Sequence, residues 1–268
     1  MIPFHHPDFC MPVIRHKVAA QVLTIVEGLG ALLLTGGRSL GWTRADPQCW
    51  SYQSAARRLL KAGLIASCDS DGGRPVLKLT REGDRRLPDE LRPERRWKMK
   101  WNGIWYVLVY DVPETRKAYR EMLRRFLHRL RMGGLQGSVW VSPFDIRPTY
   151  ADLVRAGGVA NYAVLFEART VLGQSANEVV LMAWDFGLLG AAQAWYRRTA
   201  EENLRLAAGK SLPFRDLLEL ARAETAAYLT VMKDDPLLPA ALWPAGYFGP
   251  ETVETHRRFQ RTLLQCRK

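Results

Sequence analysis

Three stretches within the first eighty residues alternate hydrophobic and polar positions in ways that predict regular structure. Apolar residues recur at helical spacing from Val18 to Leu29, and glycines follow them. A second helix is predicted over residues 51–61, because its apolar residues share one side and Gly63 can end it in a left-handed conformation. After the sequence DGG, alternation resumes over residues 76–79, which predicts a β-hairpin.

The second helix and the hairpin carry side chains that suit DNA. Two helices followed by a glycine-tipped hairpin are the order of a winged helix-turn-helix domain, whose second helix enters the major groove. Side chains expected to read or approach base edges are Tyr52, Gln53, Ser54, Arg57 and Arg58. Side chains expected to contact phosphates are Lys61, Arg74 and Lys78. The alternative is a small helical domain with a solvated basic face.

The middle of the chain alternates between segments with strand periodicity and segments with helical periodicity. Residues 104–110 form a β-rich run, and residues 115–132 show an apolar stripe at helical spacing. A second strand is predicted over 135–143, a short helix over 150–157 and a third strand over 161–169. This alternation predicts a small α+β sandwich with its helices on one face of the sheet.

The last third of the chain is mainly helical in its pattern. Amphipathic helices are predicted over 177–209, 211–233 and 252–265, with a proline-rich stretch before the last of them. The fold class is therefore α+β, and we expect three domains. These are a winged helix-turn-helix domain over 1–93, a ferredoxin-like domain over 94–174 and a helical domain over 175–268.

Charge is distributed unevenly along the chain. The net charge is +12, and residues 1–150 hold 25 Lys and Arg against 14 Asp and Glu, whereas the remaining residues hold 14 against 13. An excess of this sign favours a polyanionic partner, most simply double-stranded DNA. Residues 116–131 add a basic flank, which is either a second nucleic-acid surface or a solvated helix face.

Motifs for other chemistry are absent from the sequence. The four cysteines are scattered, so neither a disulfide framework nor a zinc site is expected. The histidines lack ligand spacing, and no nucleophile elbow, P-loop or dinucleotide fingerprint occurs. Neither a signal peptide nor a membrane-length apolar run is seen. We therefore expect a cytoplasmic protein without a cofactor, catalytic residues, a metal site or a membrane partner, associated with the nucleoid when bound to DNA.

Three tryptophans, Trp97, Trp101 and Trp105, stand four residues apart where the first two predicted domains meet. Aromatic rings can stack on bases. The spacing also suits tryptophans that pack one domain against the next, and we favour this interpretation.

Five segments spread along most of the chain resemble one family. They are GRPVLKLTREG, WNGIWYVLVYDVPETRKAYREMLRRFLHRL, GGLQGSVWVSPFD, AWDF and DPLLPAALWPAGYFG. They resemble the PaaX repressors of phenylacetic acid degradation. The resemblance implies a winged helix that binds operator DNA as a dimer, and a central ferredoxin-like domain similar to the small CRISPR adaptation proteins. It also implies a C-terminal helical domain and an effector of the acyl-CoA type.

The chain departs from the family pattern at residues 221–234. The family pattern has an arginine-rich helix before DPLLP, where this chain reads ARAETAAYLTVMKD. An arginine cluster would suit the phosphates of an acyl-CoA. No residues of an effector pocket can be named from the sequence.

The competing hypothesis, a metal-dependent nuclease, depends on Asp111. The resemblance to the adaptation proteins places an aspartate at the end of the first central strand, where two copies across a dimer would hold a divalent cation for phosphodiester cleavage. The alternative role for Asp111 is to cap the helix that begins near Glu114. We favour the capping role. The leading hypothesis is therefore a sequence-specific transcriptional regulator, a repressor that binds a palindromic operator as a homodimer, and the alternative is a metal-dependent nuclease targeted by the winged helix.

Overall fold

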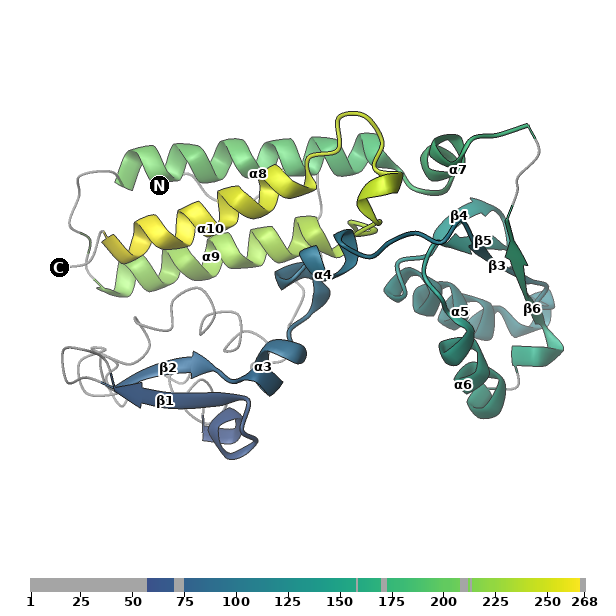
Figure 1. The fold of residues 1–268 in the computed structure, drawn as a ribbon, viewed down its shortest axis with the longest axis horizontal. Coiled ribbons are helices and arrows are strands. Elements are labelled where there is room, and N and C mark those ends of the chain that lie inside the picture. Colours follow the sequence, from purple (N-terminus) through teal and green to yellow (C-terminus); the bar gives the residue numbers. More distant parts are fainter. Residues whose placement is uncertain are drawn as a thin grey trace. The chain divides into compact units, whose positions relative to one another are not determined.

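The computed structural model describes residues 57–69, 75–157, 159–169, 173–207, 212 and 214–265. The chain divides into two compact units, each built from segments that are distant in the sequence (Figure 1). The helical unit contains the described residues up to Arg92, Ala192–Lys233 and those from Phe248 onward. The sheet unit contains Pro93–Ala191 and Asp234–Tyr247. Helices and sheets are both present, so the predicted α+β class is confirmed.

The sheet unit is built around four antiparallel strands in the order β4-β5-β3-β6. Strand β3 is central, and its Leu108 lies opposite Trp140 of β5 on one side and Leu165 of β6 on the other. The connectivity β-α-β-β-α-β with this order is that of a ferredoxin-like sheet. The elements are α4 (Glu94–Trp97), β3 (Trp105–Tyr110), η2 (Glu114–Arg116), α5 (Lys117–Arg129), β4 (Gly133–Gln136), β5 (Val139–Ser142), α6 (Arg147–Gly157), η3 (Val159–Asn161), β6 (Ala163–Ala168), α7 (Ala176–Ala183) and η4 (Ala240–Leu242).

Both faces of this sheet are packed. On one face the alternate residues of β3, such as Leu108, contact Leu123 and Leu127 of α5 together with residues of α6. This is the face that the sequence predicted to be covered by helices. On the other face Trp105 packs with Val180 of α7 and with the segment before and within η4. The prediction of helices on one face was therefore incomplete, because α7 and the DPLLP segment form a second core.

Residues 135–143, predicted as one strand, form parts of two strands. Helix α5 ends at Arg129, and Arg131 follows with a φ of 60°. This left-handed residue closes a C-terminal motif in which the Met132 N–H donates to the Leu127 carbonyl at 3.1 Å. Strand β4 then begins directly, and Gly137 turns the chain into β5 with a φ of 49°. The prediction of a single strand was wrong because glycine at a positive φ makes a tight turn there.

Residues 177–209, predicted as one helix, contain a break. Helix α7 ends at Trp184, whose backbone is extended, and α8 begins at Phe186. The carboxylate of Asp185 accepts a hydrogen bond from the Leu188 N–H at 2.8 Å, which satisfies one of the free donors at the start of α8. A capping box formed by Ser175 and Glu178 starts α7 in a similar way.

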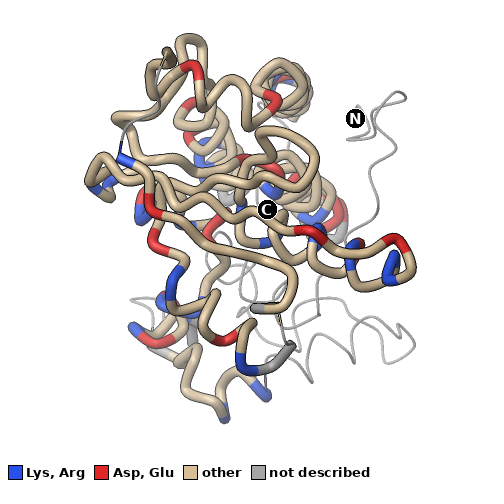
Figure 2. Tube along the Cα trace, turned by 90° about the vertical axis from the view of Figure 1, so that its right-hand side faces the viewer, with Lys and Arg blue, Asp and Glu red and all other residues tan. Residues whose placement is uncertain are grey.

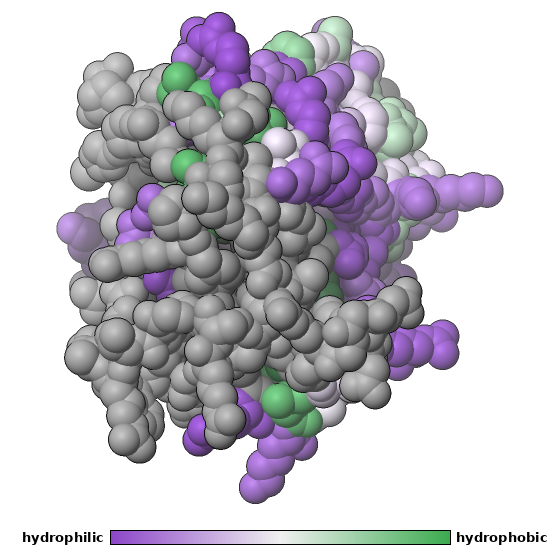
Figure 3. Space-filling view, turned by 90° about the vertical axis from the view of Figure 1, so that its left-hand side faces the viewer, coloured by the Kyte–Doolittle hydropathy of each residue, from purple (hydrophilic) through white to green (hydrophobic). Residues whose placement is uncertain are grey.

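The helical unit combines a bundle with the predicted hairpin. Tyr196 of α8 packs on Tyr228 of α9, with 5.9 Å between ring centroids, and α10 packs on α9. The Tyr228 hydroxyl donates to the Glu90 carbonyl of η1 at 2.7 Å, which joins the bundle to the segment that follows the hairpin. The elements are β1 (Ile65–Asp69), β2 (Pro75–Leu79), α3 (Arg81–Arg85), η1 (Asp89–Leu91), α8 (Phe186–Ala207, from Ala192 on), α9 (Phe214–Lys233) and α10 (Gly249–Gln265). The space-filling view in Figure 3 shows mostly hydrophilic side chains where the residues on this side are described.

Candidate nucleic-acid interface

The end of the predicted reading helix is well defined. Residues 57–61 are helical, and Gly63 has a φ of 68°. The Gly63 N–H donates to the Leu60 carbonyl at 3.0 Å, and the Leu64 N–H donates to the Leu59 carbonyl at 2.9 Å. These two bonds form a Schellman motif, in which a left-handed residue closes the helix. The predicted helix end at Gly63 is confirmed.

The side chains at this helix end separate by polarity. Leu59 is buried, whereas Arg57, Arg58 and Lys61 are all exposed. Arg57 and Lys61 are four residues apart, so they project from the same side of the helix. Leu60, which the apolar stripe was expected to include, is 40% exposed. Three of the predicted contact residues are therefore exposed to solvent.

The hairpin supplies a fourth exposed cation. Strands β1 and β2 pair antiparallel, with Lys78 opposite Ala66. The Lys78 side chain is exposed. Ile65 of β1, which pairs with the neighbouring Leu79, is buried. The hairpin prediction is confirmed. Four further predicted contact residues, which are Tyr52, Gln53, Ser54 and Arg74, lie outside the described residues.

Thr80 fastens the hairpin to the helix end. Its hydroxyl donates to the Gly63 carbonyl at 2.6 Å and accepts from the Gly83 N–H at 3.0 Å, so it also caps α3. Its backbone N–H donates to the Leu64 carbonyl at 3.1 Å. Gly83 itself lies against Leu64, since a β-carbon at Gly83 would stand 1.8 Å from the Leu64 carbonyl oxygen. The helix end and the base of the hairpin therefore form one small rigid assembly.

Replacing Gly83 with alanine should disrupt this assembly. The new methyl group would overlap a backbone oxygen, and overpacking of this kind costs about 1–3 kcal/mol. Because the overlapped atom belongs to the backbone and cannot turn aside as a side-chain end can, we expect a loss near the upper end of that range in urea unfolding. Gly190→Ala is the matched control, since its β-carbon meets no atom within 4 Å and alanine favours the helix. Equal unfolding midpoints for the two variants would contradict this packing.

The tryptophans pack inside the sheet unit. Trp97 lies edge-on to Trp243, with 5.6 Å between centroids, and Trp101 lies 5.1 Å from Trp105. Trp97 and Trp105 are both buried. These two rings therefore serve packing, and neither offers a face on which a base could stack.

Asp111 lies exposed just after β3. Its N–H donates to the Tyr162 carbonyl at 2.7 Å. The predicted capping role is wrong, because Pro113 and Arg116 occupy the N-cap positions of η2 and α5 and neither helix has a side-chain cap. The extended backbone of Pro113 delays the start of the helix. In the part of the chain that the structure describes, no group of three or more His, Cys, Asp and Glu residues could hold a metal ion.

A buried polar cluster lies inside the helical bundle. Glu224 of α9 is fully buried, and its carboxylate accepts hydrogen bonds from the Tyr196 hydroxyl and from the His256 Nδ1, the latter at 2.7 Å. Gln260 lies 3.0 Å from the other His256 nitrogen, and Tyr228 stacks on the imidazole at 3.8 Å. Burial and the nearby carboxylate raise the pKa of Tyr196 well above its usual value, so its hydroxyl keeps its proton and donates.

The sequence did not reveal this cluster. Glu224 and Tyr228 lie in the segment 221–234, which was noted only because it lacks a cluster of arginines. Their partners come from α8 and α10, and His256 is 32 positions away from Glu224. The sequence signal for this cluster was a polar residue within the apolar stripe of a helix. Its partners could not be identified from the sequence, because they depend on how three helices pack.

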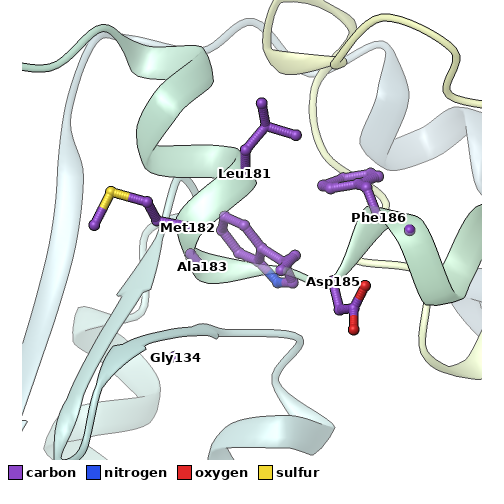
Figure 4. Close-up of a pocket in the computed structure, with 8 residues that line it drawn as sticks. Gly134, Leu181, Met182, Ala183, Asp185 and Phe186 are labelled. Atoms are coloured by element: carbon purple, nitrogen blue, oxygen red, sulfur yellow. The ribbon is translucent and has the colours of Figure 1, made fainter.

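The sheet unit contains an open hollow between α7 and the start of α8 (Figure 4). Its lining includes Leu181, Met182, Trp184 and Phe186, and Asp185 supplies a carboxylate. The residues that line it include no lysine or arginine. The hollow therefore lacks the cations that the phosphates of an acyl-CoA would need.

Figure 2 shows basic and acidic residues interspersed along much of the described chain. No helix of the described residues is long and apolar enough to cross a membrane.

Comparisons with known proteins bear on the central part of the chain. Residues 98–180 match the family model described as the PaaX protein central Cas2-like domain. A solved structure, the uncharacterized protein Rv0674 from Mycobacterium tuberculosis, is similar with a TM-score of 0.47 and 20% identity, covering 93% of this chain and 97% of that chain. None of the curated proteins matches the sequence. The resemblance of residues 98–180 to the PaaX family is thus confirmed, and this segment matches the family's central Cas2-like domain.

Proposed function

We propose that the protein is a sequence-specific DNA-binding transcriptional regulator, a repressor that binds a palindromic operator as a homodimer. The observation that carries the proposal is the group of exposed cations Arg57, Arg58 and Lys61 at a helix end that Thr80 fastens to the hairpin of Lys78. The PaaX-type central domain supports a regulatory role, and the net charge of +12 suits a polyanionic partner.

The proposed contact residues fall into two groups, those that contact bases and those that contact phosphates. Arg57 and Arg58 present guanidinium groups, which can bond the O6 and N7 atoms of guanine together in the major groove. Tyr52, Gln53 and Ser54, which lie outside the described residues, would approach base edges as well. Contacts to phosphate position the protein without reading sequence, and these belong to Lys61, Arg74 and Lys78.

Two copies of the chain would present two reading helices to one face of the duplex. Such a dimer requires an inverted repeat with half-sites about 34 Å apart, or a multiple of that distance. An effector of the acyl-CoA type would release the operator if it binds the two dimer geometries with unequal affinity. The hollow of Figure 4 lacks cations, so such an effector would place its phosphates elsewhere.

Selection of genomic fragments by the purified protein tests the proposal. We expect enrichment of a short set of sites that share one inverted repeat, and the neighbouring genes would suggest the pathway and the inducer. Uniform recovery of fragments without a shared sequence would contradict sequence-specific recognition.

The nuclease alternative makes a separate prediction at Asp111. We expect duplex DNA to remain intact in the presence of Mg²⁺ or Mn²⁺, because a single carboxylate per chain is a weak ligand set for a divalent cation. Asp111→Ala should bind DNA as the parent does, since Asp111 lies outside the predicted reading helix and the hairpin. Agarose electrophoresis of a plasmid substrate measures cutting. Cutting by the parent that Asp111→Ala abolishes, with DNA binding retained, would replace the regulator by the nuclease.

A further inference from the structure

Helix α5 has one face made of basic side chains. Five of its thirteen residues are Lys or Arg and one, Glu121, is acidic. Leu123 and Leu127 are buried against the sheet. On the opposite side the exposed cations form what we call the α5 basic face, which consists of Lys117, Arg124, Arg125 and Arg129. At 1.5 Å per residue this face is about 18 Å long.

The cations of the α5 basic face lack the acidic partners that other surface arginines have. On the same sheet unit Arg147 pairs with Asp145 at 2.7 Å and with Glu167 at 2.9 Å, and Arg155 pairs with Asp152. Among the described residues no ion pair involves a member of the α5 basic face. The guanidinium of Arg125 bonds only the Glu121 carbonyl, and that of Arg129 lies over the Phe126 ring. Within the described structure the four positive charges of this face are therefore offset only by the exposed carboxylate of Glu121, which forms no ion pair with them.

The composition of the face favours phosphates over a protein surface. Protein interfaces have apolar centres that are depleted in charge, whereas contacts to nucleic-acid backbones are made by Lys and Arg that each meet a phosphate. Met122 is the one exposed large apolar side chain of α5. Three of the four cations are arginines, whose planar forks bond phosphate oxygens in pairs. A row about 18 Å long corresponds to roughly five base-pair steps along the duplex axis, at about 3.4 Å of rise each.

We propose that the α5 basic face binds the sugar-phosphate backbone of duplex DNA without regard to sequence, as a contact separate from the reading helix. This inference rests on the proposed function, because it assumes that the protein binds DNA. It assigns to the Cas2-like domain a share of the affinity and none of the specificity. Each cation that meets a phosphate releases counterions, so the face should steepen the salt dependence of binding.

The test removes charge in steps and follows binding by fluorescence anisotropy. The full-length variants are Arg124→Gln, Arg124→Gln with Arg125→Gln, and both of these with Lys117→Gln. We expect affinity for an operator duplex and for a shuffled duplex to fall by the same factor. We also expect the slope of log affinity against log salt to flatten by about 0.9 for each cation removed. All three side chains are exposed, and equal urea midpoints for variants and parent verify that the fold is intact.

The matched control removes the same charge elsewhere. Arg155→Gln, Arg205→Gln and Arg261→Gln together delete three exposed arginines, each of which is paired with an acidic side chain. A salt slope unchanged by this control but flattened by the α5 variants supports the proposal. Equal effects of the two triple variants would overturn it, since only net charge would then matter. So would α5 variants that bind DNA as the parent does but no longer bind anionic vesicles. A parent that binds neither duplex would instead refute the proposed function itself.

Discussion

Replacing Glu224 with alanine should lower the free energy of unfolding by about 3–5 kcal/mol, the cost of removing one partner from a buried ionic or hydrogen-bonded cluster. The carboxylate of Glu224 is fully buried and accepts bonds from Tyr196 and His256. Alanine would leave both donors buried without an acceptor, and it would leave a cavity between three helices. Urea unfolding followed by far-UV circular dichroism reports the loss, because α8, α9 and α10 dominate that signal.

Two further variants serve as comparisons: one removes the charge of Glu224 but keeps its shape, and the other removes a carboxylate at the surface. Glu224→Gln keeps the shape and one acceptor oxygen, so it should lose less than the alanine variant. Glu254→Ala removes an exposed carboxylate of α10 that pairs with Arg261, and exposed pairs contribute about 1 kcal/mol or less. If Glu224→Ala and Glu254→Ala unfolded at the same urea concentration, the buried cluster would contribute nothing to stability.

The cluster also connects the bundle to the candidate DNA interface. Tyr228 stacks on His256 and donates to the Glu90 carbonyl of η1, in the segment that follows α3. Helix α3 is capped by Thr80, which holds Gly63 at the end of the reading helix. Loss of the cluster should therefore destabilise the segment that supports the hairpin, because packed and hydrogen-bonded groups connect the two.

Local sequence patterns predicted the elements whose signals are contained within a few residues. Gly63 ended its helix as expected, because only a residue tolerant of positive φ closes a Schellman motif without strain. The alternation in β2 predicted a strand with Lys78 exposed. The strand, helix and strand order of the central region predicted a small α+β sandwich, and the structure has one antiparallel sheet with helices against it. The family model over residues 98–180 agrees with the family resemblance of its segments.

Features that depend on tertiary contacts were missed. Arg131 adopts a positive φ that is unusual for its residue type, and its guanidinium donates to the Asp235 carbonyl, more than a hundred positions away. The break between α7 and α8 depends on Asp185, which serves as a cap only because Trp184 is extended and donates to the Arg131 carbonyl. Asp111 was expected to cap a helix that begins near Glu114, but Pro113 lies between them and occupies the N-cap position of η2. In each case a distant partner or a backbone turn overrode the local pattern.

Substitution of Arg57 by alanine should cost about 1–3 kcal/mol of operator binding, or about 5- to 150-fold in affinity, if its guanidinium contacts a base. Arg57 is exposed at the helix end, on the side opposite the buried Leu59. Because the lost contact is to a base, affinity for a shuffled duplex should change much less, and specificity at one operator position should relax. Anisotropy titrations with both duplexes at matched salt measure the difference.

Lys78→Ala is the comparison that distinguishes a contact to a base from a contact to a phosphate. Lys78 is an equally exposed cation on β2, and a contact from it to phosphate should weaken binding to operator and shuffled duplexes by the same factor. The slope of log affinity against log salt should then flatten by about one unit. If Arg57→Ala behaved as Lys78→Ala does, Arg57 would be a phosphate contact and the bases would be read from elsewhere. If it left operator affinity unchanged, residues 51–61 would not lie in the groove at all.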